Sequence, residues 1–167
     1  MAGYGTGSYN NSGYSGGTRS SQGNYGGGRG YGRQGNAGTT APRPHKTLDA
    51  NTYVDVAEQV IKSLRDGKGL LTTSKIRNLL SMISSLYDEV RRERADRLSR
   101  EDQGRIQYIR LHFAYEAGRD NKVKDFVEAA DIFAHIREIG ENKEKFLLFC
   151  RYMEALVAYH RYYGGKE

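Results

Sequence analysis

The chain has few of the residues that crosslink small folds or bind metals. It contains one cysteine, Cys150, only two prolines and no tryptophan, so no disulfide can form within it. Cys150 lies in the apolar run FLLFC, which predicts a buried and unreactive thiol. The four histidines stand apart, and none has a partner at a spacing that strongly indicates a metal site. We therefore expect no metal and no cofactor.

Long apolar runs and catalytic motifs are also missing. No stretch approaches the length of a membrane span, and the N-terminus has no apolar segment of a secretory signal. There is no P-loop, and the glycine-rich GGGRGYG follows no strand and opens no helix. No nucleophile lies beside a general base in a recognisable pattern. These absences favour a cytoplasmic protein that is not an enzyme, has no small-molecule substrate and does not bind a membrane.

The N-terminal tail, residues 1–46, has no acidic residue and no Leu, Ile, Val or Phe. It holds 14 of the 21 glycines and 5 of the 13 tyrosines. Such a segment cannot bury enough apolar surface to offset the entropy of ordering, so we predict that it is disordered. Its interleaved Arg, Tyr and Gly, as in YGGGRGYGRQG, resemble RNA-associated low-complexity segments. The alternatives are a solubilising tail or weak self-association.

The remaining 121 residues hold 21 basic and 20 acidic side chains, so this part is close to neutral. Residues 47–167 are predicted to form an all-α bundle of about five helices, because apolar residues recur at helical spacing and proline is absent. The expected helices are 52–65, a second from Thr72 or Thr73 onward, 103–117, 121–139 and 142–163. The second should run on into DEVRRERADRLSREDQGR, where acids precede bases by four residues, before a break near 99–104 with Asp102 as a possible cap.

The third and fourth predicted helices are apolar on two sides. In the third, one side carries Ile106, Ile109, Phe113 and Ala117, and the other carries Tyr108, Leu111 and Tyr115. The fourth has a similar pattern, with Phe133 on one side and Ile132 on the other. A helix that is apolar all round is usually buried, so both are expected to lie centrally.

Basic residues stand at two helix starts where acids are normally preferred. LLTTSKIRNLL places Lys75 and Arg77 in a stretch, 67–87, without any acid. The turn GRDNKVK places Arg119, Lys122 and Lys124 between the third and fourth helices. Side-chain charge next to unpaired backbone N–H groups suits a phosphate. We therefore predict sequence-independent, salt-sensitive RNA binding at these residues.

Two further candidates for RNA binding lie along the helices themselves, Arg110 and Arg137. Arg137 occupies the last turn of the fourth predicted helix, where a favourable interaction with the helix dipole is an alternative explanation.

Three segments together resemble the small subunit of type III-A CRISPR–Cas effector (Csm) complexes. They are LLTTSKIRNLL, IRLHFAYEAGRDNKVKDFVEAADIFAHI and FLLFCRYMEALVAYHRYYGG. The resemblance covers roughly residues 48–165. It implies a non-catalytic helical subunit that stacks in several copies beside other Csm subunits and lines the channel where guide RNA pairs with target RNA. It also implies that Lys75, Arg77, Arg119 and Lys122 face the nucleic acid.

Two other functions fit the same sequence. The near-neutral domain and its two-sided helices would suit a protein–protein adaptor, or a homodimer, without RNA contact. Alternatively, the N-terminal tail alone could carry the affinity for RNA.

Overall fold

The computed structural model of the chain describes residues 47–165, and the predicted disordered tail, residues 1–46, lies outside them. Within 47–165 there are six helices and no strand, only an isolated bridge between Arg97 and Asn142. The all-α prediction is confirmed. The helices are α1 (Tyr53–Asp66), α2 (Thr73–Arg92), α3 (Arg100–Arg119), α4 (Asn121–Ala129), α5 (Ile132–Ile139) and α6 (Lys143–Tyr162).

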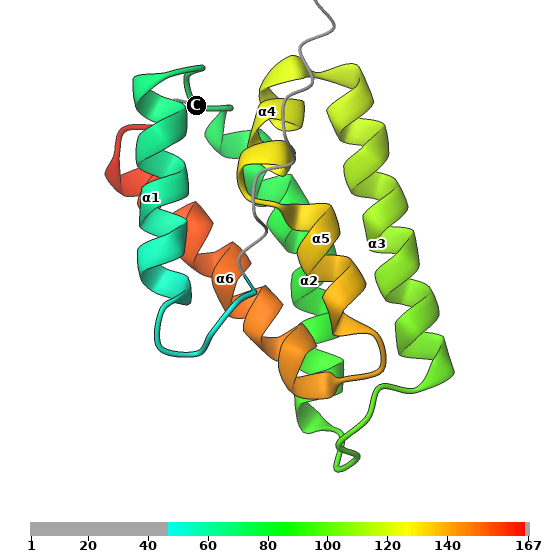
Figure 1. The fold of residues 1–167 in the computed structure, drawn as a ribbon. Helices are drawn as coiled ribbons and strands as arrows, with labels where there is room; N and C mark the ends of the chain where they lie inside the picture. Colours follow the sequence, from blue (N-terminus) through cyan, green and yellow to red (C-terminus); the bar gives the residue numbers. More distant parts are fainter. Residues whose placement is uncertain (1–46, 166–167) are drawn as a thin grey trace, which may run out of the picture. The chain divides into compact units, whose positions relative to one another are not determined.

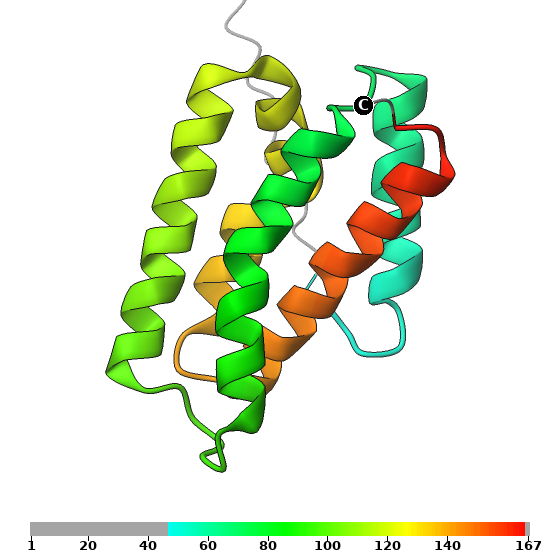
Figure 2. The same cartoon turned by 180° about the vertical axis from the view of Figure 1, so that it is seen from behind.

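Helix α6 lies against three other helices, α1, α2 and α5, while α3 packs against α2, α4 and α5. Figures 1 and 2 show α3 at the edge of the bundle from both sides. The chain runs up α1, down α2 and up α3 in the view of Figure 1. The end of α3 and the starts of α2 and α4 therefore lie at one end of the bundle.

The core is built around large side chains that solvent does not reach. The largest are Tyr152, Phe113, Phe126, Phe146 and Phe149. Cys150 is buried as predicted, and burial raises the pKa of its thiol.

Two polar groups of α6 are also buried, and each contacts a backbone carbonyl. The Tyr152 hydroxyl donates to the carbonyl of Ala130 at 3.3 Å, and His160 Nε2 lies 2.7 Å from the carbonyl of Leu71. Each bond satisfies groups that would be costly to bury alone. The second bond also holds the loop before α2 against α6.

The second helix is shorter than predicted. It ends at Arg92, and the chain then crosses to α3 through a loop in which Leu98 is buried. The Leu98 N–H donates to the carbonyl of Glu141 at 2.9 Å, and Arg97 pairs with Glu141 at 3.1 Å. In this run the sequence places acids four residues before bases, and two of these pairs, Glu93–Arg97 and Asp96–Arg100, do not lie on a helix as predicted. Burial of Leu98 outweighs the weak preference of these charges for a helix.

The start of the third helix also differs from the prediction. Ser99, rather than Asp102, is the cap residue, and α3 begins at Arg100. The Ser99 hydroxyl accepts from the Asp102 N–H at 3.0 Å, and the Asp102 carboxylate accepts from the Ser99 N–H at 3.3 Å. This reciprocal pair is a capping box.

The predicted fourth helix is two helices. Ala130 and Asp131 separate α4 from α5, and Asp131 has a φ of 50°. Aspartate tolerates this left-handed conformation better than most residues that carry a side chain. A continuous helix over 121–139 is therefore wrong.

The expectation that α3 is central is also wrong. Its first apolar side is buried, but Tyr108, Leu111 and Tyr115 are 62%, 63% and 58% exposed. The second apolar side of α3 therefore belongs to the surface of the described domain.

We predict that Ser99→Ala lowers the free energy of unfolding by about 1 kcal/mol, because the start of α3 loses its cap. Urea unfolding followed by circular dichroism would measure this change. Ser84→Ala is the matched control: Ser84 is exposed within α2 and only bonds back to the carbonyl of Leu80 at 3.0 Å. Its loss should change stability by less than half as much, and an equal loss in both variants would contradict a special role for the cap.

Candidate nucleic-acid interface

A groove of about 420 Å³ runs between α2 and α3. We call it the α2–α3 groove, and its lining residues are Lys75, Asn78, Leu79, Ser81, Met82, His112, Glu116, Arg119 and Val123. It brings together one candidate from each of the two basic segments, Lys75 and Arg119. The sequence separates them by 44 positions, and the antiparallel packing of α2 on α3 places them in one groove.

The start of α2 has no acid of its own, and its counter-charge comes from the junction between α3 and α4. Lys75 pairs with the carboxylate of Asp120, the residue that joins α3 to α4. Asp120 also accepts from the N–H groups of Lys122 and Val123 at 2.7 and 3.2 Å. The expectation of unpaired N–H groups at the start of α4 is therefore wrong for these two. The ammonium of Lys75 holds the pKa of Asp120 below its ordinary value, and the two N–H bonds lower it further.

The other candidates near this end differ in how much of their charge is engaged. Arg119 lies 3.5 Å from Glu116 and 5.2 Å from the ring centre of Tyr115. The ammonium of Lys122 donates to the carbonyl of Lys68. The exposed ion pair between Arg119 and Glu116 is weak, so the guanidinium of Arg119 remains available to an anion that binds it more strongly.

Lys124 and Arg77 do not line the groove. Lys124 is 4.0 Å from Glu128. Arg77 is exposed and has no ion pair within the described part of the chain. Its positive charge is therefore the least engaged of this group.

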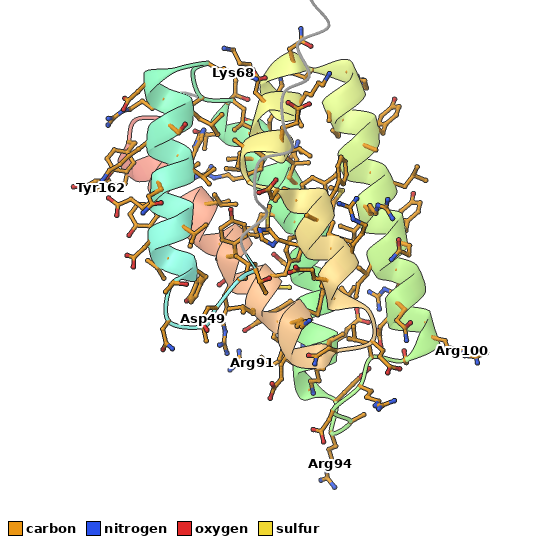
Figure 3. The ribbon with its side chains drawn as sticks, viewed as in Figure 1. Asp49, Lys68, Arg91, Arg94, Arg100 and Tyr162 are labelled. Carbon is orange, nitrogen blue, oxygen red and sulfur yellow. The ribbon has the colours of Figure 1, made fainter. Side chains whose placement is uncertain are left out.

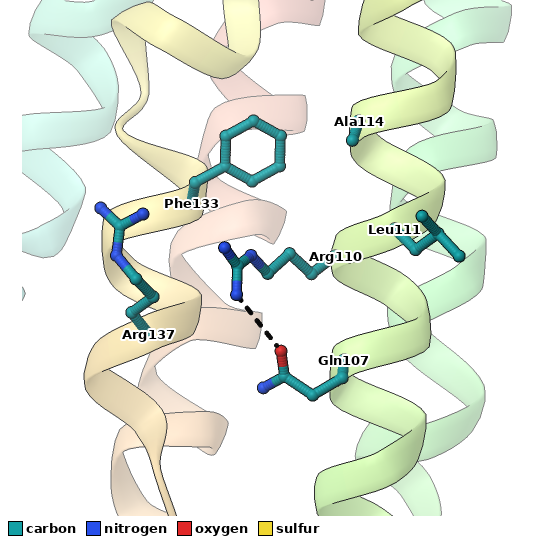
Figure 4. Close-up of a pocket in the computed structure, with 6 residues that line it drawn as sticks. All are labelled: Gln107, Arg110, Leu111, Ala114, Phe133 and Arg137. Carbon is teal, nitrogen blue, oxygen red and sulfur yellow. Dashed lines mark hydrogen bonds between the residues drawn. The ribbon is translucent and has the colours of Figure 1, made fainter.

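A second hollow, the α3–α5 pocket, lies on the other side of α3. It measures about 410 Å³ and is lined by Gln107, Arg110, Leu111, Ala114, Phe133 and Arg137. Figure 4 shows Arg110 reaching from α3 toward α5 and Phe133 pointing back toward α3. Arg110 donates to the Gln107 amide oxygen at 3.4 Å. Two guanidinium groups thus share a pocket whose lining contains no acid, an arrangement that favours an anionic ligand.

The exposed side of α3 carries an aromatic ridge, formed by Tyr108, Leu111, His112 and Tyr115. These residues bound an open hollow of about 340 Å³. The sequence pattern assigned the two tyrosines and Leu111 to the core, and so missed them as surface residues. Asp120 was also missed as a site residue, although an Asp just before a helical run is a recognisable capping signal.

The chemistry of these surfaces suits anion binding. No group of three or more His, Cys, Asp or Glu side chains that could hold a metal occurs among residues 47–165. None of the helices in the described domain is both long and apolar enough to cross a membrane. Lysine and arginine side chains supply hydrogen-bond donors for phosphate oxygens. Asn78 and Ser81 are small and uncharged, so the phosphate backbone of a nucleic acid can approach this groove closely.

Comparison with known proteins places this arrangement in a family. The family model "Csm2 Type III-A" matches residues 47–166. The chain belongs to the type III-A Csm2 family. The match begins where the predicted N-terminal tail ends, so residues 1–46 fall outside the family model.

Curated relatives named CRISPR system Cms protein Csm2 come from several bacteria. The Streptococcus thermophilus protein is 48% identical over 123 residues, which cover 72% of this chain and 98% of that protein. The Mycobacterium tuberculosis H37Rv protein is 40% identical over 117 residues, or 69% and 94% of the two chains. The Enterococcus italicus protein is 35% identical over 126 residues, or 70% and 89%. The likeness therefore extends over nearly the full length of these Csm2 proteins.

We predict that Asp120→Asn destabilises the domain at neutral pH, because it removes the charge that pairs with Lys75. The pKa of Asp120 is lower in the folded state than in the unfolded state. The stabilisation that its carboxylate gives is therefore complete above the unfolded pKa of about 3.9 and is lost as the pH falls through the folded pKa. The difference in urea midpoint between wild type and Asp120→Asn should therefore disappear in acid. Urea midpoints measured from pH 7 to pH 2 would follow it.

Asp88→Asn is the control for this titration, because Asp88 is exposed on α2 and has no ion pair within the described residues. It should shift the midpoint little at any pH. If the difference in urea midpoint between wild type and Asp120→Asn stayed constant down to pH 2, the charge of the Asp120 carboxylate would not be what stabilises the fold.

Proposed function

We propose that this chain is a non-catalytic, RNA-binding structural subunit of a type III-A CRISPR ribonucleoprotein in antiviral defence. It lines the channel that holds paired guide and target RNA, and it contacts the backbone without reading sequence. Its partners are other Csm subunits, further copies of itself stacked along the complex, and the guide–target duplex. This function places it in the cytoplasm.

The observation that carries the proposal is the pair of cationic hollows on the two flanks of α3. The α3–α5 pocket holds Arg110 and Arg137 with no acid in its lining. The α2–α3 groove holds Lys75 and Arg119, which pair with Asp120 and Glu116 through exposed ion pairs that an RNA phosphate can replace. A nearly neutral domain has little positive charge in excess, so its concentration on both sides of one helix supports contact with a polyanion.

The residue types support backbone contact over base reading. Phosphate contacts from Lys and Arg position a nucleic acid but carry no sequence information. In RNA-guided systems sequence is read by base pairing with the guide, while the protein recognises shape and backbone. Family membership supports the role of the other Csm subunits as partners.

We predict that Arg110→Ala/Arg137→Ala and Lys75→Ala/Arg77→Ala each weaken target-RNA binding by the assembled complex and flatten its salt dependence. Each lost phosphate contact should reduce the slope of log affinity against log salt by about 0.7–0.9. Filter binding at several salt concentrations would measure the slope. Subunit stoichiometry, checked by gel, separates lost contact from lost assembly.

Arg94→Ala is the matched control, since Arg94 is an exposed arginine without an ion pair in the described domain. Figure 3 places it at the far end of the bundle from Lys68. It removes one positive charge of the same kind and should leave the slope unchanged. If neither double variant changed affinity or slope, direct contact through these residues would be refuted.

Deletion of residues 1–46 tests whether the N-terminal tail alone carries the affinity for RNA. Under our proposal the truncated chain still enters the complex and retains most target binding, because the cations of the hollows remain. Co-purification with guide RNA and gel-shift titration would measure both. Complete loss of RNA binding with normal assembly would move the function to the tail.

A further inference from the structure

We propose that the aromatic ridge of α3 is a stacking platform for unpaired RNA bases. This inference rests on the proposed function and deepens it. The cationic hollows hold the phosphates, and the ridge between them takes the bases that leave the strand. Base–aromatic stacking is tolerant of sequence, because every base has a π-face.

The rings of the ridge are arranged as a row rather than scattered. The ring centres of Tyr108 and His112 are 5.2 Å apart at 74°, and those of His112 and Tyr115 are 6.5 Å apart at 78°. Both tyrosines are more than half exposed. These three rings and Leu111 bound an open hollow of about 340 Å³ on the outer side of α3. A planar ligand can therefore enter without displacing core residues.

Charge favours nucleic acid over a protein as the occupant of the ridge. The segment 104–115 of α3 contains no acid and carries two arginines, Arg110 and Arg105, of which Arg105 pairs with Glu89 of α2. The guanidinium of Arg119 lies over the ring of Tyr115 at 5.2 Å. A ligand on the ridge meets cations of the α2–α3 groove on one side and of the α3–α5 pocket on the other. RNA supplies flat rings and phosphates in one molecule, whereas an ordinary protein surface supplies neither in this combination.

The occupant is expected to be unpaired. Bases within a duplex are stacked on each other, so their faces are hidden from protein rings, and recognition of double-stranded RNA works through shape and backbone. Bases of a single strand, or bases displaced from a duplex, present free faces.

The test compares a single-stranded RNA oligomer with an abasic ribose–phosphate oligomer of equal length, each titrated against the full-length chain. Loss of stacking on one ring corresponds to about fivefold to more than a hundredfold in affinity. Tyr108→Leu/Tyr115→Leu should weaken binding of the RNA by at least about tenfold. The same variant should hardly change binding of the abasic oligomer. The slope of its log affinity for RNA against log salt should equal that of wild type.

Two variants control for other effects. Tyr108→Phe/Tyr115→Phe keeps the rings and removes only the hydroxyls, so it should bind RNA nearly as wild type. Tyr162→Leu changes a tyrosine that is 77% exposed at the end of α6, away from α3, and should have no effect. Circular dichroism verifies that each variant is folded, which is expected because these side chains are largely exposed.

Crosslinking in the assembled complex gives an independent measurement. Trypsin cleaves after Arg105, Arg110 and Arg119, so Tyr108 falls in peptide 106–110 and the other two rings fall in peptide 111–119. Target RNA that contains 4-thiouridine should crosslink to these peptides on irradiation, and the Leu variant should lose the signal.

The outcomes separate this inference from the proposed function. If the arginine variants weaken RNA binding but the Leu variant binds RNA like wild type, the platform is refuted and the proposed function stands. If the Leu variant leaves the complex while RNA binding by the free chain is unchanged, the ridge is a protein interface and the platform is again refuted. If no variant changes RNA binding, both proposals fail.

Discussion

One carboxylate, that of Asp120, determines how the two basic segments meet. It caps α4 through two backbone N–H groups and pairs with Lys75 at the start of α2. These bonds join the end of α3, the start of α4 and the start of α2 at one point. The α2–α3 groove takes its position from that junction, because Arg119 directly precedes Asp120 in the chain. Asp120 thus neutralises Lys75 and also fixes the position of Arg119.

Helix α3 borders both hollows and carries the aromatic ridge. Its inner side contributes Phe113 to the core, and its two flanks border the cationic hollows. Its outer side presents the aromatic ridge. A helix at the edge of a bundle can divide its circumference in this way, whereas a central helix must bury all of it. The position of α3 therefore matters more to the proposed function than the small net charge of the domain.

The sequence predicts the all-α class, the burial of Cys150 and the general location of the basic segments, because these depend on local spacing and composition. The ion-pair partner of each charged side chain could not be predicted. Nothing near Lys75 indicates that its partner is 45 positions away, since tertiary packing supplies it. The two-sided helices misled for different reasons: in α3 the second side is exposed to solvent, while in the predicted fourth helix it arises from an undetected break at Asp131.

The break at Ala130 and Asp131 also changes the direction in which the side chains of α5 face around the helix axis. Val123 faces the core, and Arg137 follows it by 14 residues. At 3.6 residues per turn, an unbroken helix would return Arg137 to within about 40° of the direction of Val123, toward the apolar interior. The two residues that interrupt the helix reset this angle, so Ile132, Ile136 and Ile139 are buried and Arg137 is exposed. A single left-handed aspartate thus decides which side chains of α5 meet solvent.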